Sequence, residues 1–146
     1  MSNYEIVAII FSSLSILISI ISFIVSNVSN NRQKKISQGQ VEIQINQMIS
    51  NTKKELMDIS LLIADGSKDI LTQAFKSARE LNMNAYDEAC AKYLDNKVNK
   101  ERFKRNYCIE IRRLVEDKNN SEFFNPTTSP YRCILKVYNE WNNLEK

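Results

Sequence analysis

One long apolar segment dominates the start of the chain. Residues 6–25 read IVAIIFSSLSILISIISFIV, which is fifteen apolar residues and five serines without a charge. A helix of that length extends about 30 Å, which matches the hydrocarbon thickness of a bilayer. The pattern therefore predicts a membrane-spanning helix within residues 1–30.

A cleavable signal peptide is the alternative for this segment. The five residues before it, however, carry no Lys or Arg, and no small-residue cleavage site follows it. We therefore expect a retained helix. Arg32, Lys34 and Lys35 lie directly after it. The positive-inside rule then places the N-terminus outside and the C-terminal domain in the cytoplasm.

Serines recur along this helix in alternating steps of three and four residues, which is the period of a coiled-coil seam. This serine stripe consists of Ser12, Ser15, Ser19, Ser22, Ser26 and Ser29. Small hydroxylated side chains let membrane helices approach closely and hydrogen-bond to one another. The stripe predicts a homo-oligomer in which the serines either pack as a seam or line a pore.

Residues 31–65 are expected to form a helical stalk. The seven-residue spacing of the stripe continues through Gln33, Gln40 and Gln47, with Ile36 and Ile43 between them. A short strand over residues 41–46 is the alternative, because apolar and polar residues alternate there. Helical spacing returns from Thr52 to Ala64, before the turn signal of Asp65 and Gly66.

Residues 66–146 show the apolar spacing of four amphipathic helices. The first begins at Ser67 and buries Ile70, Leu71, Ala74, Phe75, Ala78 and Leu81. The second spans residues 84–94 and buries Tyr86, Ala89, Cys90 and Tyr93. The third begins at the cap residue Asn99, ends near Glu116 and buries Phe103, Tyr107, Ile111, Leu114 and Val115.

The fourth helix follows a loop over residues 117–128. Ser129 is its expected cap and Pro130 its first residue. Its apolar positions are Tyr131, Ile134, Leu135, Tyr138 and Trp141. With only two Gly and two Pro in 146 residues, an all-β fold lacks turn residues. We expect an all-α protein with a transmembrane helix (1–30), a stalk (31–65) and a cytosolic bundle (66–146).

The composition removes most catalytic chemistry. The chain has no His, which excludes imidazole general bases, Ser–His and Cys–His pairs and His-containing zinc sites. Its glycines are isolated, and the pairs Asp87/Glu88 and Glu116/Asp117 read as solvated or helix-end charges. Cys90, Cys108 and Cys133 are expected to be small core residues. We expect neither an enzyme nor a cofactor nor a metal.

Positive charge is concentrated between residues 92 and 113, where eight basic residues accompany three acidic ones. On a helix, Arg102, Arg105 and Arg112 share a face and are candidates for binding an anion such as a nucleotide, RNA or lipid phosphate. A basic helix face that serves only solubility is the alternative.

The chain resembles the small membrane proteins linked to bacterial anti-phage systems. The resemblance lies in the signal-anchor helix, the polar stalk after Arg32, Lys34 and Lys35, and the helical domain with AYDEACAKYLDNKVNKERFKRNYCIEIRRLVED. It points to transmembrane accessory proteins of CRISPR type VI-B loci and to membrane effectors of type III loci. The former have a HEPN-like domain, whose nuclease signature requires a His that this chain lacks.

The resemblance implies a bacterial inner-membrane protein that assembles as a ring or pore. We therefore expect an oligomeric, pore-type membrane effector of anti-phage defence, gated by its cytosolic helical domain. A non-conducting membrane anchor that recruits a cytosolic protein is the alternative. The expected partners are membrane lipid, further copies of the chain, and a trigger that is a cytosolic protein, a nucleotide or RNA.

Overall fold

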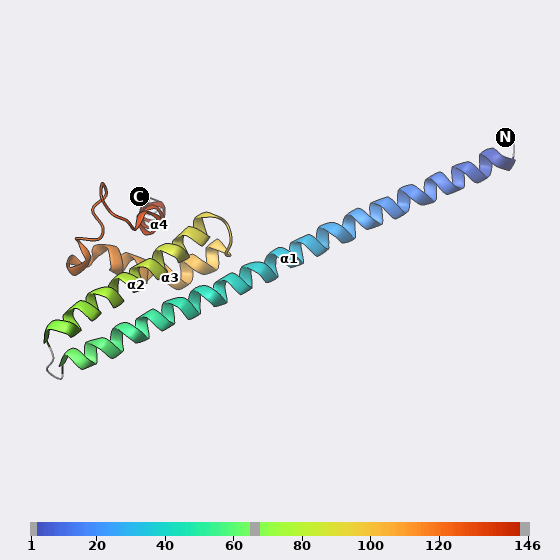
Figure 1. Ribbon diagram of the computed structural model, residues 1–146. Coiled ribbons are helices and arrows are strands. Elements are labelled where there is room, and N and C mark those ends of the chain that lie inside the picture. The colour runs from blue at the N-terminus through green and yellow to red at the C-terminus, as the bar shows by residue number, and fades with distance from the viewer. Residues whose placement is uncertain (1–2, 65–67, 144–146) are drawn as a thin grey trace. The chain divides into compact units, whose positions relative to one another are not determined.

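The computed structural model describes residues 3–64 and 68–143, and throughout this part of the chain the regular elements are helices (Figure 1). These are α1 (Asn3–Ala64), α2 (Lys68–Leu94), α3 (Lys100–Glu116), the 3-10 turn η1 (Lys118–Asn120) and α4 (Arg132–Asn143). The expected all-α class is confirmed. Contacts divide the chain into two units, Met1–Ser37 and Gln38–Lys146.

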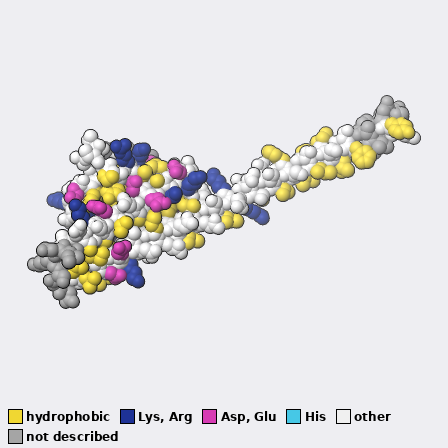
Figure 2. Space-filling view, viewed as in Figure 1, with side chains coloured by type: hydrophobic (Ala, Val, Ile, Leu, Met, Phe, Trp, Pro, Cys, Tyr) yellow, Lys and Arg dark blue, Asp and Glu magenta, His cyan; other side chains and the backbone are white. Residues whose placement is uncertain are grey.

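The first unit is the N-terminal part of α1. Its described side chains from Phe11 to Ser37 are all exposed, and hydrophobic ones cover much of its surface (Figure 2). Among the residues that the structure describes, α1 is the one helix long and apolar enough to cross a membrane. Large apolar surfaces of this kind mark contact with lipid or with another protein.

The second unit includes the C-terminal part of α1. Residues 41–46 are helical, so the alternative of a strand is wrong. The reason is visible in the burial: Ile45 and Ile49, one helical turn apart, are each 3% exposed, whereas Ile43 is 60% exposed. A strand would place residues 43 and 45 on one face, whereas a helix separates them. Residues of the expected stalk thus contribute to the core.

Helix α2 is continuous where the sequence predicted two helices. The expected break at residues 82–83 lies inside the helix, and both side chains are buried. Asn82 Nδ2 donates a hydrogen bond to Thr52 Oγ1 on α1, 2.9 Å away. This bond satisfies a polar side chain that would otherwise disfavour the helix interior. Leu81, expected in the core, is 47% exposed, and the expected cap Ser67 lies outside the described residues.

Helix α3 agrees with its prediction. Asn99 is its N-cap, and the Asn99 side chain accepts a hydrogen bond from the backbone N–H of Arg102. Phe103, Tyr107 and Ile111 are buried on its inner face. The expected core residues Leu114 and Val115 are half-buried and pack against the same core.

Helix α4 begins at Arg132, two residues later than predicted. Ser129 Oγ does accept a hydrogen bond, but from the backbone N–H of Tyr131. The helix itself is capped by Asp87 of α2, whose Oδ1 accepts from the backbone N–H groups of Cys133 and Ile134 at 2.9 and 3.0 Å. A carboxylate from another helix therefore fixes the start of α4.

The core lies between these helices and is rich in aromatic rings. The ring of Trp141 in α4 meets that of Tyr93 in α2 edge to face, with centroids 5.5 Å apart, and Trp141 Nε1 donates to Tyr93 Oη. The ring centroid of Phe103 lies 5.3 Å from that of Tyr93 and 4.8 Å from that of Tyr107. These contacts join α2, α3 and α4 into one packed body.

Candidate functional site

The serine stripe lies in the first unit, and all six of its side chains are exposed. Ser15 Oγ donates to the carbonyl of Phe11 at 2.9 Å, and Ser19 Oγ donates to the carbonyl of Ser15 at 2.8 Å. Hydroxyls bonded to their own helix are tolerated in a bilayer. Ser15 and Ser19 share a shallow, open groove with Ile16, Ile20 and Phe23.

The C-terminal part of α1 has a second exposed face at the same spacing. We call it the outer stripe; it consists of Gln40, Ile43, Gln47, Ser50, Lys54, Met57 and Leu61, all exposed. Met57 is 63% exposed and Leu61 60%. The helix face opposite packs into the core through Ile45 and Ile49. One helix thus supports the core and also presents an exposed stripe with the period of a coiled coil.

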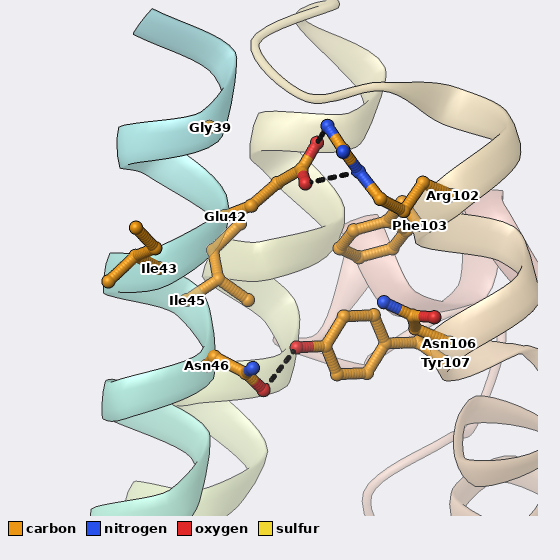
Figure 3. A pocket seen from close by; sticks show the side chains of 9 residues that line it. All are labelled: Gly39, Glu42, Ile43, Ile45, Asn46, Arg102, Phe103, Asn106 and Tyr107. Carbon is orange, nitrogen blue, oxygen red and sulfur yellow. Dashed lines mark hydrogen bonds and ion pairs between the residues drawn. The ribbon is translucent and has the colours of Figure 1, made fainter. Parts of the chain in front are cut away.

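Three polar contacts join α1 to α3 within the second unit. Arg102 Nε lies 2.6 Å from Glu42 Oε2, Tyr107 Oη donates to Asn46 Oδ1 at 3.0 Å, and Lys53 Nζ lies 2.7 Å from Glu110 Oε1. Figure 3 shows the first two contacts across the gap between the helices. Because the residue numbers of the paired side chains increase together along the two helices, α1 and α3 run parallel here.

A cavity of about 320 Å³ opens between these contacts. Its lining mixes polar and apolar side chains: Glu42, Ile43, Ile45, Asn46, Arg102, Phe103, Asn106 and Tyr107, with Gly39 at one end (Figure 3). A second cavity of about 440 Å³ shares Asn46, Asn106 and Tyr107 with it. Amide groups next to aromatic faces can hold a polar side chain or a small molecule.

Glu110 on α3 connects the region of these two cavities to α2. Tyr86 Oη donates to Glu110 Oε2 at 2.6 Å. Burial raises the pKa of Glu110, but hydrogen bonds from Lys53 and Tyr86 outweigh it, and the net pKa is lowered. Burial, followed by the bond to Glu110, raises the pKa of Tyr86. Glu110 is therefore an ionised, structural carboxylate rather than a proton donor.

The three candidate arginines lie on α3 but do not have a common environment. Arg102 forms the ion pair with Glu42, sixty residues earlier in the chain. Arg112 is half-buried and donates to Asn142 Oδ1 of α4 at 3.3 Å. Arg105 is exposed. The three arginines predicted to share a face therefore contact α1, α4 and solvent, respectively, in the order Arg102, Arg112 and Arg105. Their role as an anion site stays a prediction.

The cysteines lie in or beside the core. Cys90 is completely buried, whereas Cys108 and Cys133 are half-buried, and all three are free thiols. Burial, together with the charge of Asp87, raises the pKa values of Cys90 and Cys133. Raised pKa values disfavour the reactive thiolate. Within the described residues, no group of three His, Cys, Asp or Glu side chains could hold a metal ion.

Glu42 and Asn46 were not identified from the sequence as residues that line the cavity between α1 and α3, nor was Asp87 identified as a cap of α4. Glu42, Asn46 and Lys53 recur at steps of four and seven residues, which is the signal that could have placed them on one helix face. Asp87 gives no such signal, because its two N–H partners lie on α4, more than forty residues later. No protein-family model, curated protein or solved structure matches this chain.

Proposed function

We propose that this protein is a single-pass membrane protein that assembles through the serine stripe into a homo-oligomer. In this proposal the serine hydroxyls line a conducting path, and the bundle formed by Gln38–Lys146 controls it from the cytoplasm. The protein then acts as a pore-type effector in the inner membrane of a bacterium. Its proposed place in anti-phage defence rests on the resemblance of its expected architecture to effectors of that kind.

The observation that carries the proposal is the pair of exposed stripes on α1. The serine stripe and the outer stripe keep one spacing, and each is exposed within its own unit. Identical chains inserted with one topology run in the same direction, so identical residues meet. A side chain such as Ile43 or Met57 then loses its contact with water on assembly, which favours association.

The basic flank supports the orientation. Arg32, Lys34 and Lys35 are exposed and follow the apolar segment, while Glu5 is the one charged side chain before it. Such a bias retains the basic side in the cytoplasm. The free thiols Cys90, Cys108 and Cys133 accord with a reducing compartment.

The pore is tested in bacterial cells that express the full chain, with a dye that reports membrane potential. We expect the wild type to depolarise the inner membrane, and the double variant Ser19→Leu with Ser22→Leu to lose this effect while still inserting. Leucine replaces a wettable lining by an apolar one, and apolar constrictions close to ions by dewetting. The control is Ser13→Leu, the same replacement at a serine outside the stripe, which should retain depolarisation.

Depolarisation that survives both stripe replacements would contradict the pore. An inserted wild type that forms cross-linked oligomers yet leaves the potential unchanged would instead favour the second candidate, a non-conducting anchor that recruits a cytosolic protein. One observation favours this candidate: Met57, Leu61 and Leu62 are large apolar side chains exposed near the C-terminal end of α1. Such surface is available to a protein partner.

A further inference from the structure

The turn between α2 and α3 and the first residues of α3 carry unpaired positive charge. We call Lys97, Lys100, Lys104 and Arg105 the basic turn. Lys97 and Arg105 are exposed, and Figure 2 shows Lys and Arg side chains gathered at this end of the second unit. Between residues 92 and 105 there are six basic residues and two acidic ones. The turn therefore has a strong excess of positive charge.

Ion pairs within the unit leave part of this charge uncompensated. Arg102 is paired with Glu42, and Lys92 Nζ lies 3.7 Å from Glu88 Oε1. Lys100 Nζ lies 4.8 Å from the centre of the Tyr93 ring. Within the described part of the chain, no carboxylate forms an ion pair with Lys97, Lys104 or Arg105. Three cations are thus available to an anionic partner.

Hydrogen bonds hold this turn at the point where α1 enters the second unit. Gln38, the first residue of the unit, donates from Nε2 to the carbonyls of Asn96 and Val98 at 3.4 and 3.3 Å. One turn further along α1, Glu42 Oε1 accepts from the backbone N–H of Asn99 at 2.9 Å. The position of the basic turn is therefore tied to the start of the unit.

The chain itself then limits how far the turn can lie from a bilayer. Gln38 follows Val25, the last residue of the apolar segment, by thirteen positions, or about 20 Å at helical rise. The headgroup layer occupies about 5–8 Å of that distance. A lysine side chain reaches about 6 Å, and the screening length at physiological salt is about 8 Å. So short a connection allows the basic turn to reach the headgroups.

We infer that the basic turn docks on anionic lipid headgroups of the membrane that α1 crosses. The inference rests on the membrane span of the proposed function, but on neither its oligomer nor its pore. The cytoplasmic leaflet has a negative surface potential of about −30 mV, which attracts basic segments close to the membrane. Docking would hold the bundle against the bilayer, and added salt would release it.

The experiment measures lysine acylation of the full chain in lipid nanodiscs by mass spectrometry. One set of discs contains only zwitterionic phosphatidylcholine, and the other also contains anionic phosphatidylglycerol. Acylation requires the uncharged amine, and a potential of about −30 mV raises the local proton concentration about threefold. We expect Lys97, Lys100 and Lys104 to react about three times more slowly in the anionic discs, and this difference to vanish at high salt.

Lys76 and Lys118 serve as internal controls. Both are exposed and belong to the far end of the unit, since Lys76 precedes the end of α2 by five helical turns and Lys118 follows the end of α3. Their rates should be equal in both discs. In the double variant Lys97→Gln with Arg105→Gln, Lys100 and Lys104 should lose their protection, whereas Lys76→Gln with Lys118→Gln should leave it intact.

Equal rates at Lys97, Lys100 and Lys104 in the two discs would overturn the inference, as would protection that free inorganic phosphate produces in the neutral discs. Protection that is the same at Lys76 and Lys118 would also overturn it, because it would show a general surface effect. A chain that fails to enter discs at all would instead contradict the membrane span. The two failures are therefore distinguishable.

Discussion

Asp87 has a structural role that depends on its charge and its position. Its carboxylate lies on α2 and accepts two backbone N–H groups at the start of α4. The first N–H groups of a helix lack partners inside the helix, and the positive end of the helix dipole favours an anion there. Asp87 thus stabilises the contact of α4 with α2.

We expect Asp87→Ala to lower the free energy of unfolding by about 1–2 kcal/mol, since two capping bonds are lost. Asp87→Asn should lose less, because an amide oxygen still accepts. Trp141, the single tryptophan, is buried in α4, so its fluorescence during denaturant unfolding in mild detergent reports the change. Glu88→Ala is the control; its ion pair is on the surface, and its cost should stay near zero.

Glu110 predicts a pH dependence. Its folded pKa is lowered from the ordinary 4.5, so ionised Glu110 stabilises the fold above that pH. The stabilisation is lost as the pH falls below about 4.5 and through the folded value. Glu110→Gln should be less stable at neutral pH and show a smaller loss on acidification, measured by Trp141 fluorescence. Parallel pH curves for both chains would contradict the assignment.

Helix α1 both contributes to the core and presents an exposed face. Its C-terminal part supplies Ile45 and Ile49 to the core, while the outer stripe remains exposed. We expect Ile45→Ala to cost about 2–5 kcal/mol of unfolding free energy, the usual cost of truncating a buried isoleucine. Ile43→Ala, two residues away on the exposed face, should cost within about 0.5 kcal/mol in the detergent-solubilised monomer. Equal costs would contradict the assignment of faces.

Local sequence signals predicted a helix correctly where the capping residue lies next to the helix in the chain. Asn99 and the spacing of Phe103, Tyr107 and Ile111 predicted α3 correctly. The break expected at Asn82 was wrong, because its compensation comes from Thr52, thirty residues away. The start of α4 and the pairing of Glu42 with Arg102 likewise depend on tertiary contacts. Single-chain patterns do not contain that information.

The cavity between α1 and α3 could not be predicted from the sequence for the same reason. Its two walls are separated by about sixty residues in the chain, and residues 41–46 were compatible with a strand as well as a helix. Once α1 is known to be helical, Glu42 and Asn46 fall on one face. The spacing of the serine stripe, by contrast, could be read directly, because all six residues belong to one helix.

The basic flank predicts the topology of the protein in the membrane. Protease added outside spheroplasts should leave residues 31–146 intact, because the domain is expected in the cytoplasm. In inverted vesicles the same protease should digest the domain and leave the apolar segment protected. Digestion of the bundle from outside the spheroplast would reverse the orientation and expose Cys90, Cys108 and Cys133 to an oxidising space.

A cysteine cross-linking scan in native membranes tests whether the chains associate through the serine stripe. The three native cysteines are first replaced by Ala. Oxidation should then join chains that carry Ser19→Cys or Ser22→Cys, because the proposed assembly brings these positions next to a neighbouring helix. Chains that carry Leu17→Cys or Ile24→Cys, on the opposite face, should remain monomeric. Equal cross-linking on both faces, or none at the serine positions, would show that the chains do not associate through the serine stripe.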